Sequence, residues 1–294
     1  MPSGKIVTAT AFAPAHITGF FQIHEDADLM KKGSTGCGVV LDRGVRTTVK
    51  AGGNIKDTLV FLNCREVPGD TIRSVVQKIT ADPARIDCIS DIPVGCGFGA
   101  SGAGALGTAY ALNHALSLDL TASQLNDIAH MAEVSNRSGL GDVTGQAHGG
   151  ILIRKTPGAP SIATVDSIPC SENDVYCVVL GELSTKSVIS DPEMVQGINE
   201  AGKIAMKRLM QSPSADNFML CSREFTIQSR LASEKVEEAI EAARTIDVVA
   251  SQAMLGNTVF SMPPSSAASE LEEILGDFGE VLKFRIRTGS IRIA

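Results

Sequence analysis

The chain has 294 residues, 44% of them hydrophobic, which predicts one large domain or two ordinary ones around a substantial core. Its net charge of −7 argues against nucleic acid or an anionic membrane as a partner, because both need a basic surface. No apolar run is long enough to cross a bilayer. The seven cysteines are odd in number and lack C-x-x-C spacing, so we expect a cytoplasmic protein with reduced thiols and no zinc site.

The first half of the chain alternates strand-forming segments with glycine and asparagine turns. The apolar stretch 6–15 reads as a strand that runs into a loop. A glycine-rich loop over 93–104 precedes a helix over 101–116, and Thr121 is a good N-cap for a second helix. The segment 136–147 reads as a loop, because it is rich in glycine and serine. Strands are predicted over 5–12, 38–41, 47–49, 58–62, 85–92 and 150–154.

A linker is predicted over 155–160, where two prolines occur. Beyond it, strands are expected over 175–180, 259–262 and 281–287. Helices are expected over 192–210, across 217–244 and over 266–275. Strands and helices do not alternate strictly, which favours an α+β fold over a doubly wound parallel sheet.

The glycine-rich loop is the first functional signal. Glycines let backbone N–H groups approach a phosphate closely, and the following helix adds its unpaired amides and its dipole. The hydroxyl of Ser101 could hold a metal ion or a phosphate oxygen. The candidate phosphate-binding residues are Pro93, Gly95, Gly97, Gly99, Ala100, Ser101 and Gly102.

Residue patterns alone leave three interpretations of this loop open. It is not a Walker A loop, because Gly-Lys-Ser/Thr is missing. The spacing Gly97-x-Gly99-x-x-Gly102 also fits a dinucleotide-binding turn, although the acidic residue expected about 20 positions later would fall near Asp119, just past a helix. The third interpretation is a strand-to-helix turn that binds nothing.

The loop resembles the P-x-x-x-G-[LF]-[GA]-[SA]-S motif of the GHMP kinase superfamily, in which it wraps the phosphates of ATP. By this resemblance Ser101 helps to hold Mg²⁺. A second segment, Ser138-Gly-Leu-Gly-Asp142 followed by Gly149-Gly150, is similar to the family's S-G-x-D…G-G segment. The resemblance implies that Asp142 is the catalytic carboxylate and that Glu133 completes the Mg²⁺ site. From the residue pattern alone, Asp142 would be interpreted as part of an Asx-turn and Glu133 as a solvent-exposed helix residue.

A third segment, from Ala11 to Phe21, stands where the family has its N-terminal substrate motif, with His16 in place of the usual basic residue. The segment 251–258 keeps one glycine, Gly256, of the family's C-terminal motif. These segments together resemble the archaeal pantoate kinase family over most of the chain. That resemblance implies ATP- and Mg²⁺-dependent phosphorylation of (R)-pantoate to 4-phosphopantoate, a step towards coenzyme A.

The implied fold is a two-domain GHMP kinase: residues 1–160 would resemble domain 2 of ribosomal protein S5, and residues 161–294 would be ferredoxin-like. A homodimer is a candidate assembly. The alternatives are a GHMP kinase for homoserine, shikimate or mevalonate, a non-catalytic nucleotide-binding protein and, more distantly, a dehydrogenase.

Pantoate carries a carboxylate, and arginine binds carboxylates best through two parallel hydrogen bonds. Arg154 is the leading candidate, because its strand leaves the paired glycines near Asp142. His130 is the second, one helical turn before Glu133, and Arg137 is the third. His16 joins them as a substrate-site residue through the N-terminal motif.

Overall fold

The computed structural model describes residues 5–170, 174–183, 187–188 and 190–293. In this part of the chain the strands are β1 (Ile6–His24), β2 (Gly33–Gly52), β3 (Leu59–Leu62), β4 (Arg65–Val67), β5 (Ala84–Ser90), β6 (Ile151–Arg154), β7 (Val165–Ile168), β8 (Asp174–Gly181), β9 (Ala250–Gln252), β10 (Asn257–Ser261), β11 (Val281–Arg285) and β12 (Arg292–Ile293). The helices are α1 (Asp70–Ile79), α2 (Ala100–Leu116), α3 (Ala122–Asn136), α4 (Asp142–His148), α6 (Pro192–Gln211), α7 (Ala215–Ser229), α8 (Glu234–Arg244) and α9 (Ala268–Gly276).

The strands form two sheets. The larger sheet has the order β12-β1-β2-β5-β3-β4, with β6 paired to β2 and β7 paired to β6. The smaller sheet has the order β11-β8-β10-β9. Its four strands all pair antiparallel, and among the described residues of the larger sheet only β3 and β5 pair in parallel. This arrangement is the predicted α+β class.

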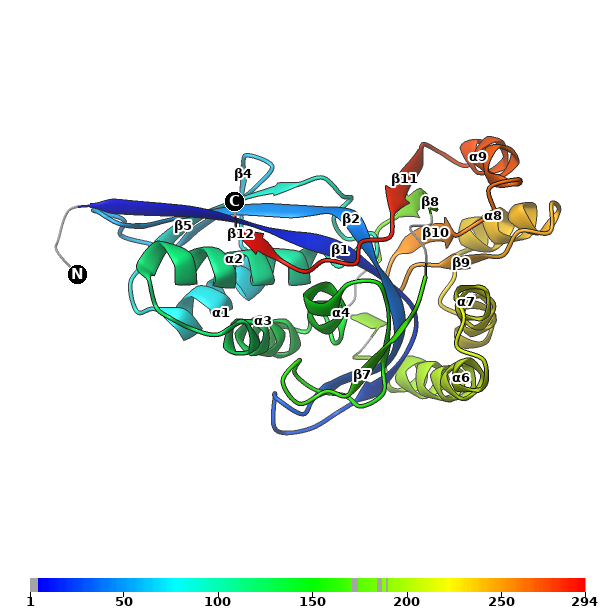
Figure 1. Cartoon of the computed structure of the whole chain (residues 1–294), viewed down its shortest axis with the longest axis horizontal. Helices are drawn as coiled ribbons and strands as arrows, with labels where there is room; N and C mark the ends of the chain where they lie inside the picture. Colours follow the sequence, from blue (N-terminus) through cyan, green and yellow to red (C-terminus); the bar gives the residue numbers. More distant parts are fainter. Residues whose placement is uncertain (1–4, 171–173, 184–186, 189, 294) are drawn as a thin grey trace.

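A long antiparallel hairpin, β1–β2, connects the two ends of the molecule (Figure 1). The prediction that the first strand ends in a loop near Ala15 is wrong, because pairing with β2 continues to His24↔Gly33. The register shifts directly after Pro14, and such an irregularity tolerates a residue that has no N–H to donate. The two short strands predicted over 38–41 and 47–49 are parts of the single strand β2.

Helices α1, α2 and α3 cover one face of the larger sheet (Figure 1). Helix α2 is buried along most of its length, because its small residues let it pack closely on β1 and β2. Thr121 caps α3 as predicted, and Gln124 closes a capping box with it.

Two of the helices given above for the described ranges, α1 and α4, were not expected from the sequence. Helix α4 occupies much of the predicted 136–147 loop, and it is stabilised by the burial of Val143, Thr144 and Gln146 despite the neighbouring glycines. Helix α1 follows Gly69, and its apolar residues Ile72, Val75, Val76 and Ile79 recur at helical spacing.

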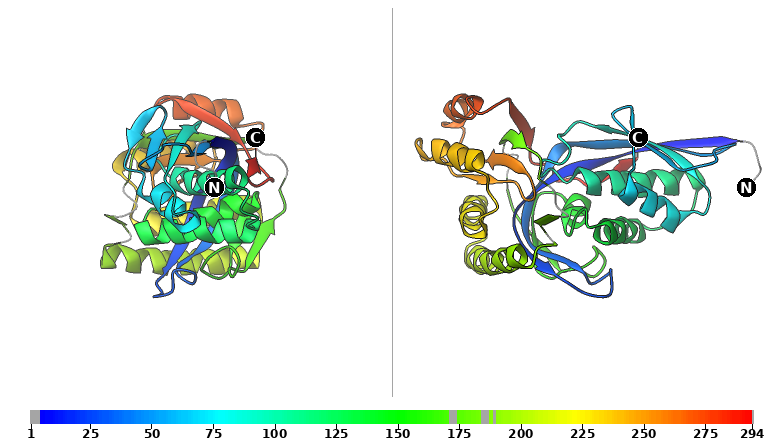
Figure 2. Two further views of the ribbon diagram at one scale, coloured as in Figure 1. Left: turned by 90° about the vertical axis from the view of Figure 1, so that its left-hand side faces the viewer. Right: turned by 180° about the vertical axis from the view of Figure 1, so that it is seen from behind.

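The smaller sheet packs on α8 and α9 at the opposite end of the molecule from α1–α3 (Figure 2). Helices α6 and α7 lie against the bent end of β1, where the Phe20 and Phe218 rings are 6.5 Å apart. Strands β7 and β12 belong to the larger sheet although both follow residue 160. The domain boundary after residue 160 stays a prediction. None of the helices in the described ranges combines the length and the apolar character that crossing a lipid bilayer requires.

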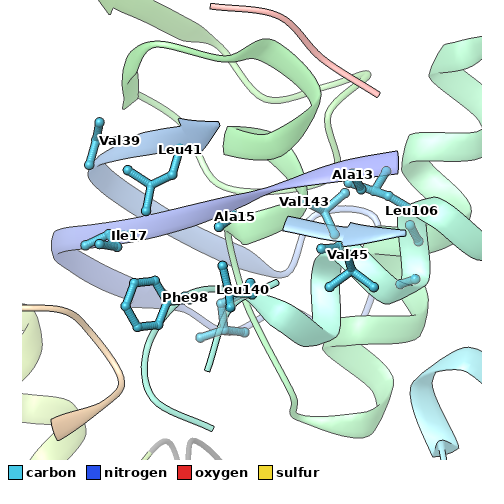
Figure 3. Close-up of a cluster of buried hydrophobic side chains, with 14 of the residues drawn as sticks. Ala13, Ala15, Ile17, Val39, Leu41, Val45, Phe98, Leu106, Leu140 and Val143 are labelled. Atoms are coloured by element: carbon cyan, nitrogen blue, oxygen red, sulfur yellow. The ribbon is translucent and has the colours of Figure 1, made fainter. Parts of the chain in front are cut away.

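A cluster of buried apolar side chains lies where the hairpin, α2, α4 and the glycine-rich loop meet (Figure 3). Phe98, Leu140 and Val143 belong to the segments that carry the candidate site residues, and all three are buried. A close-packed core is hardly compressible, so this cluster fixes the position of the loop relative to α4. The labelled members are Ala13, Ala15, Ile17, Val39, Leu41, Val45, Phe98, Leu106, Leu140 and Val143.

Candidate active site

The glycine-rich loop ends at the N-terminus of α2. Gly95, Gly97 and Gly99 have φ values of 77°, 90° and 65°, which glycine adopts without steric cost. Gly99 is the N-cap, and no side chain caps the helix. The N–H groups in the first turn of α2 therefore have no hydrogen-bond partner within the helix. Such free N–H groups can bind an anion.

Asp142 is the first residue of α4, and its Oδ1 lies 2.7 Å from Nδ1 of His16. Burial lowers the pKa of His16, so its imidazole is neutral and donates the Nδ1–H to the carboxylate. The His16 backbone N–H donates to the Phe98 carbonyl at 3.0 Å. His16 therefore orients Asp142 and ties β1 to the glycine-rich loop.

Glu133 is buried on α3, and its Oε1 accepts hydrogen bonds from Ser101 Oγ at 2.6 Å and Ser138 Oγ at 2.7 Å. Its Oε2 is buried and has no hydrogen-bond partner among the described residues. Burial raises the pKa of Glu133 to about 7, against the lowering effect of the two hydroxyls. The carboxyl group is thus held beside the Ser101 hydroxyl with one oxygen free to accept a ligand.

Two glycines allow these charged groups to approach the 138–142 segment. A Cβ on Gly139 would lie 2.0 Å from Glu133 Oε2, and a Cβ on Gly141 would lie 2.7 Å from Arg154 Nε. Any larger residue would displace the carboxyl or the guanidinium. This is the physical reason for the Gly-Leu-Gly spacing before Asp142.

Arg154, the last residue of β6, is 2% exposed. Its Nε and Nη1 are buried without a hydrogen-bond partner in the described part of the chain. Burial lowers the pKa of this guanidinium while the charge of Asp142 raises it, and an arginine stays protonated in either case. A buried cation with free N–H groups is costly in isolation, so the site is complementary to an anion.

Three hollows follow one another across the site. The apolar hollow, of about 310 Å³, is lined by Val45, Val60, Phe61, Leu62, Val67, Gly69, Asp70, Thr71, Ile72, Cys88, Val94, Ala100, Ser101, Gly104, Asn136 and Ser138. The loop hollow is lined by Val94, Gly95, Gly97, Phe98, Gly99, Ala100, Ser101, Ser138, Asp142, Leu183, Met254 and Leu255. The Arg154 hollow is lined by Thr18, Phe21, Ser34, Gly139, Leu140, Gly141, Asp142, Arg154, Met254 and Leu255.

Neighbouring hollows share residues. The apolar and loop hollows have Val94, Ala100, Ser101 and Ser138 in common, and the loop and Arg154 hollows have Asp142, Met254 and Leu255 in common. Of the predicted site residues, Ser101, Glu133, Asp142, His16 and Arg154 are thus brought together with the glycine-rich loop. A ligand could extend from the apolar hollow past the loop to Asp142.

The other two carboxylate candidates make different contacts. His130 is buried, and its Nε2–H donates to the Leu29 and Lys32 carbonyls at 3.2 and 3.0 Å. It is absent from the lining of the Arg154 hollow, within the ranges described. Arg137 donates to Ser190 Oγ at 3.1 Å. Their roles in substrate binding stay predictions.

Sequence reasoning missed Gln146 and gave Ser138 no role of its own. Gln146 is fully buried and donates from Nε2 to the Gly99 carbonyl at 2.8 Å, which couples α4 to the N-terminus of α2. Its position four residues after Asp142 places both side chains on one face of α4, and this spacing was a usable signal. Ser138 holds Glu133 and also lies 2.8 Å from Thr71 Oγ1. No sequence signal linked Ser138 to α1, because α1 was not predicted.

The raised pKa of Glu133 gives a stability prediction. The pKa of this carboxyl group is 4.5 in the unfolded chain and about 7 in the folded protein, so the folded state favours the protonated form. Its ionisation therefore costs stability progressively between these values, by about 3 kcal/mol at pH 8. We expect Glu133→Gln to raise the free energy of unfolding at pH 8 in EDTA, and to have little effect at pH 4.5. Denaturant titration of both proteins at pH 8 and pH 4.5 measures the change in the free energy of unfolding. An equal change at the two pH values would contradict the raised pKa of Glu133.

The model of the GHMP kinase N-terminal domain matches residues 67–150. This segment contains the glycine-rich loop, Glu133 and Asp142. The fold and the site thus define a kinase of the GHMP class, which favours the phosphate-binding interpretation of the loop over the dinucleotide-binding one.

Curated relatives specify the family. The chain is 36% identical to a pantoate kinase of Methanocaldococcus jannaschii over 270 residues, which cover 90% of this chain and 96% of the relative. It is 32% identical to a pantoate kinase of Methanospirillum hungatei, with 97% and 96% covered. A solved structure titled "Phosphotransferase related to CoA biosynthesis pathway" superimposes with a TM-score of 0.88 at 30% identity, covering 98% of both chains. The chain belongs to the pantoate kinase family of the GHMP kinases, and the predicted two-domain fold is confirmed.

Proposed function

We propose that the protein transfers the γ-phosphoryl group of ATP to the 4-hydroxyl of (R)-pantoate, a step in coenzyme A biosynthesis. The observation that carries the proposal is the order of the three hollows, with Ser101 at one junction and Asp142 at the other. Family membership supports the substrate, since the curated relatives are named pantoate kinases.

The nucleotide would lie in the first two hollows. The apolar hollow suits a nucleobase, because its lining is dominated by side chains such as Val60, Phe61 and Leu62. The N–H groups of the loop and of the first turn of α2 would bind the phosphates. Gln146 would hold the Gly99 carbonyl, and so the start of this turn, in place.

The acceptor would lie in the Arg154 hollow. The free Nε and Nη1 of Arg154 suit a carboxylate, which would fix pantoate with its 4-hydroxyl towards Asp142. Asp142, oriented by His16, would accept the hydroxyl proton. Phosphoryl transfer has a loose transition state, so this proton can move late and a weak base suffices.

The residues beside the loop fit Mg²⁺. Magnesium prefers one or two carboxylates together with phosphate oxygens and waters. The free Oε2 of Glu133 and the Ser101 hydroxyl supply such a set. When bound, the ion would neutralise charge on the ATP phosphates, and Glu133 and Ser101 would hold it.

This shared site predicts non-additive effects. Ser101→Ala and Glu133→Gln should each raise the Mg²⁺ concentration needed for half-maximal activity, and the double variant should be little worse than the poorer single one. Mg²⁺ titrations of ATP turnover, and of ATP binding by calorimetry, measure this. Additive effects, or an unchanged Mg²⁺ requirement, would argue against one ion held by both residues.

A coupled assay of ADP release tests the proposed reaction. The panel contains pantoate, homoserine, shikimate and mevalonate, together with an ATP-only control. We expect ADP release to depend on pantoate and to be much slower with the other alcohols. ATP binding without turnover on any member would contradict the proposal. Cytoplasmic location and a homodimer remain predictions, and size-exclusion chromatography tests the second.

A further inference from the structure

Two residues from the second half of the chain line both hollows that meet at Asp142. Met254 and Leu255 share this property with Asp142 itself. We propose that they form the apolar wall that selects an acceptor with a fully substituted carbon beside the phosphorylated one, as in the dimethyl carbon of pantoate. This inference rests on the proposed function and specifies which part of the substrate the second half of the chain recognises.

Hydrogen bonds and close packing anchor the 253–258 segment on both sides. The Met254 N–H donates to the Thr18 carbonyl at 2.9 Å, and Thr258 Oγ1 donates to the Cys96 carbonyl at 2.7 Å. Gly256 lies directly on the glycine-rich loop, because a Cβ there would be 2.1 Å from the Cys96 carbonyl carbon. The segment is therefore held in a fixed position between β1 and the loop. Residues that set substrate specificity need such a rigid support.

The lining of the Arg154 hollow combines two kinds of side chain. Thr18, Ser34, Asp142 and Arg154 supply polar groups, whereas Phe21, Leu140, Met254 and Leu255 supply apolar ones. Pantoate has the same division: its carboxylate and two hydroxyls are polar, and its third carbon carries two methyl groups. With the carboxylate at Arg154 and the 4-hydroxyl at Asp142, the methyl groups need an apolar surface close to Asp142. Met254 and Leu255 line both hollows that Asp142 lines, so they can supply this surface.

Leu255 is the better residue to test, because it is partly buried whereas Met254 belongs to the buried core. The test compares kcat/KM for pantoate with that for 2,4-dihydroxybutyrate, which lacks both methyl groups. The ratio of the two values does not depend on how much of the enzyme is folded, since both substrates are assayed on one sample. Leu255→Val is a milder second variant if Leu255→Ala is unstable.

We expect Leu255→Ala to lower the preference for pantoate by roughly 10-fold or more, as the loss of methyl contacts in an apolar pocket does. Leu255→Met keeps the apolar bulk and should keep the preference. Leu183→Ala is the matched control, because Leu183 lines the loop hollow but not the Arg154 hollow. It should leave the ratio unchanged.

An unchanged ratio in Leu255→Ala and Leu255→Val, or an equal fall in Leu183→Ala, would overturn the inference. A wild-type enzyme that does not phosphorylate pantoate would instead overturn the proposed function. The two failures are therefore separate results.

Discussion

Replacing Asp142 with asparagine should lower kcat for pantoate by about 100- to 10,000-fold, the range typical of a lost proton acceptor. Asparagine keeps the size of the side chain, and its Oδ1 can still accept the hydrogen bond from His16 that aspartate accepts at 2.7 Å. The fold and the phosphate-binding loop should therefore persist, and KM for ATP should change little. Steady-state kinetics with each substrate varied in turn measures both constants.

Asp277→Asn is the matched control for this variant. Asp277 is exposed at the C-cap of α9, among residues that pack on the smaller sheet. The control should turn over pantoate at the wild-type rate. If Asp142→Asn did so too, Asp142 would not be the proton acceptor.

Arg154→Met should raise KM for pantoate by roughly 30- to 1,000-fold, which corresponds to about 2–4 kcal/mol for a buried charge pair that loses one partner. Arg154 is 2% exposed, and two of its guanidinium nitrogens are buried without a partner among the described residues, so a bond to a carboxylate would be shielded from water. The carboxylate does not react, and Arg154 should therefore bind ground and transition states alike and leave kcat largely intact. KM for ATP should also stay near its wild-type value.

Arg137→Met and His130→Phe test the competing carboxylate ligands in the same assay. Arg137 contacts Ser190, and His130 contacts two backbone carbonyls. A larger rise in KM for pantoate in either of them than in Arg154→Met would move the carboxylate site away from Arg154.

The sequence predicted those elements that have local signals. Thr121 marked the start of α3, and the glycine-rich loop marked the start of α2. The full length of the β1–β2 hairpin had no such signal, because Pro14 and the 42–44 turn residues interrupt its pattern. Tertiary pairing overrode these local preferences.

The residues of the candidate site also divide into those that a local motif marks and those that only the tertiary structure reveals. Ser101, Glu133 and Asp142 were singled out from motifs within one stretch of chain, and the structure places them around one loop. Leu255 could not be placed from sequence, because its position against Asp142 depends on how the second half of the chain packs on β1. The four-residue spacing between Asp142 and Gln146 is a signal only within a helix, and the glycine- and serine-rich composition of 136–147 favours a loop, so the sequence prediction missed Gln146.

The central claim is that phosphate is transferred to the 4-hydroxyl of pantoate, and phosphorus NMR of the reaction product tests it most directly. The enzyme is incubated with ATP, Mg²⁺ and (R)-pantoate, and the proton-coupled spectrum is recorded. We predict a new phosphate monoester whose phosphorus couples to the two protons of the C4 methylene group. Coupling to a single proton would place the phosphate on the 2-hydroxyl, and release of inorganic phosphate alone would mean ATP hydrolysis. Either result would contradict the account.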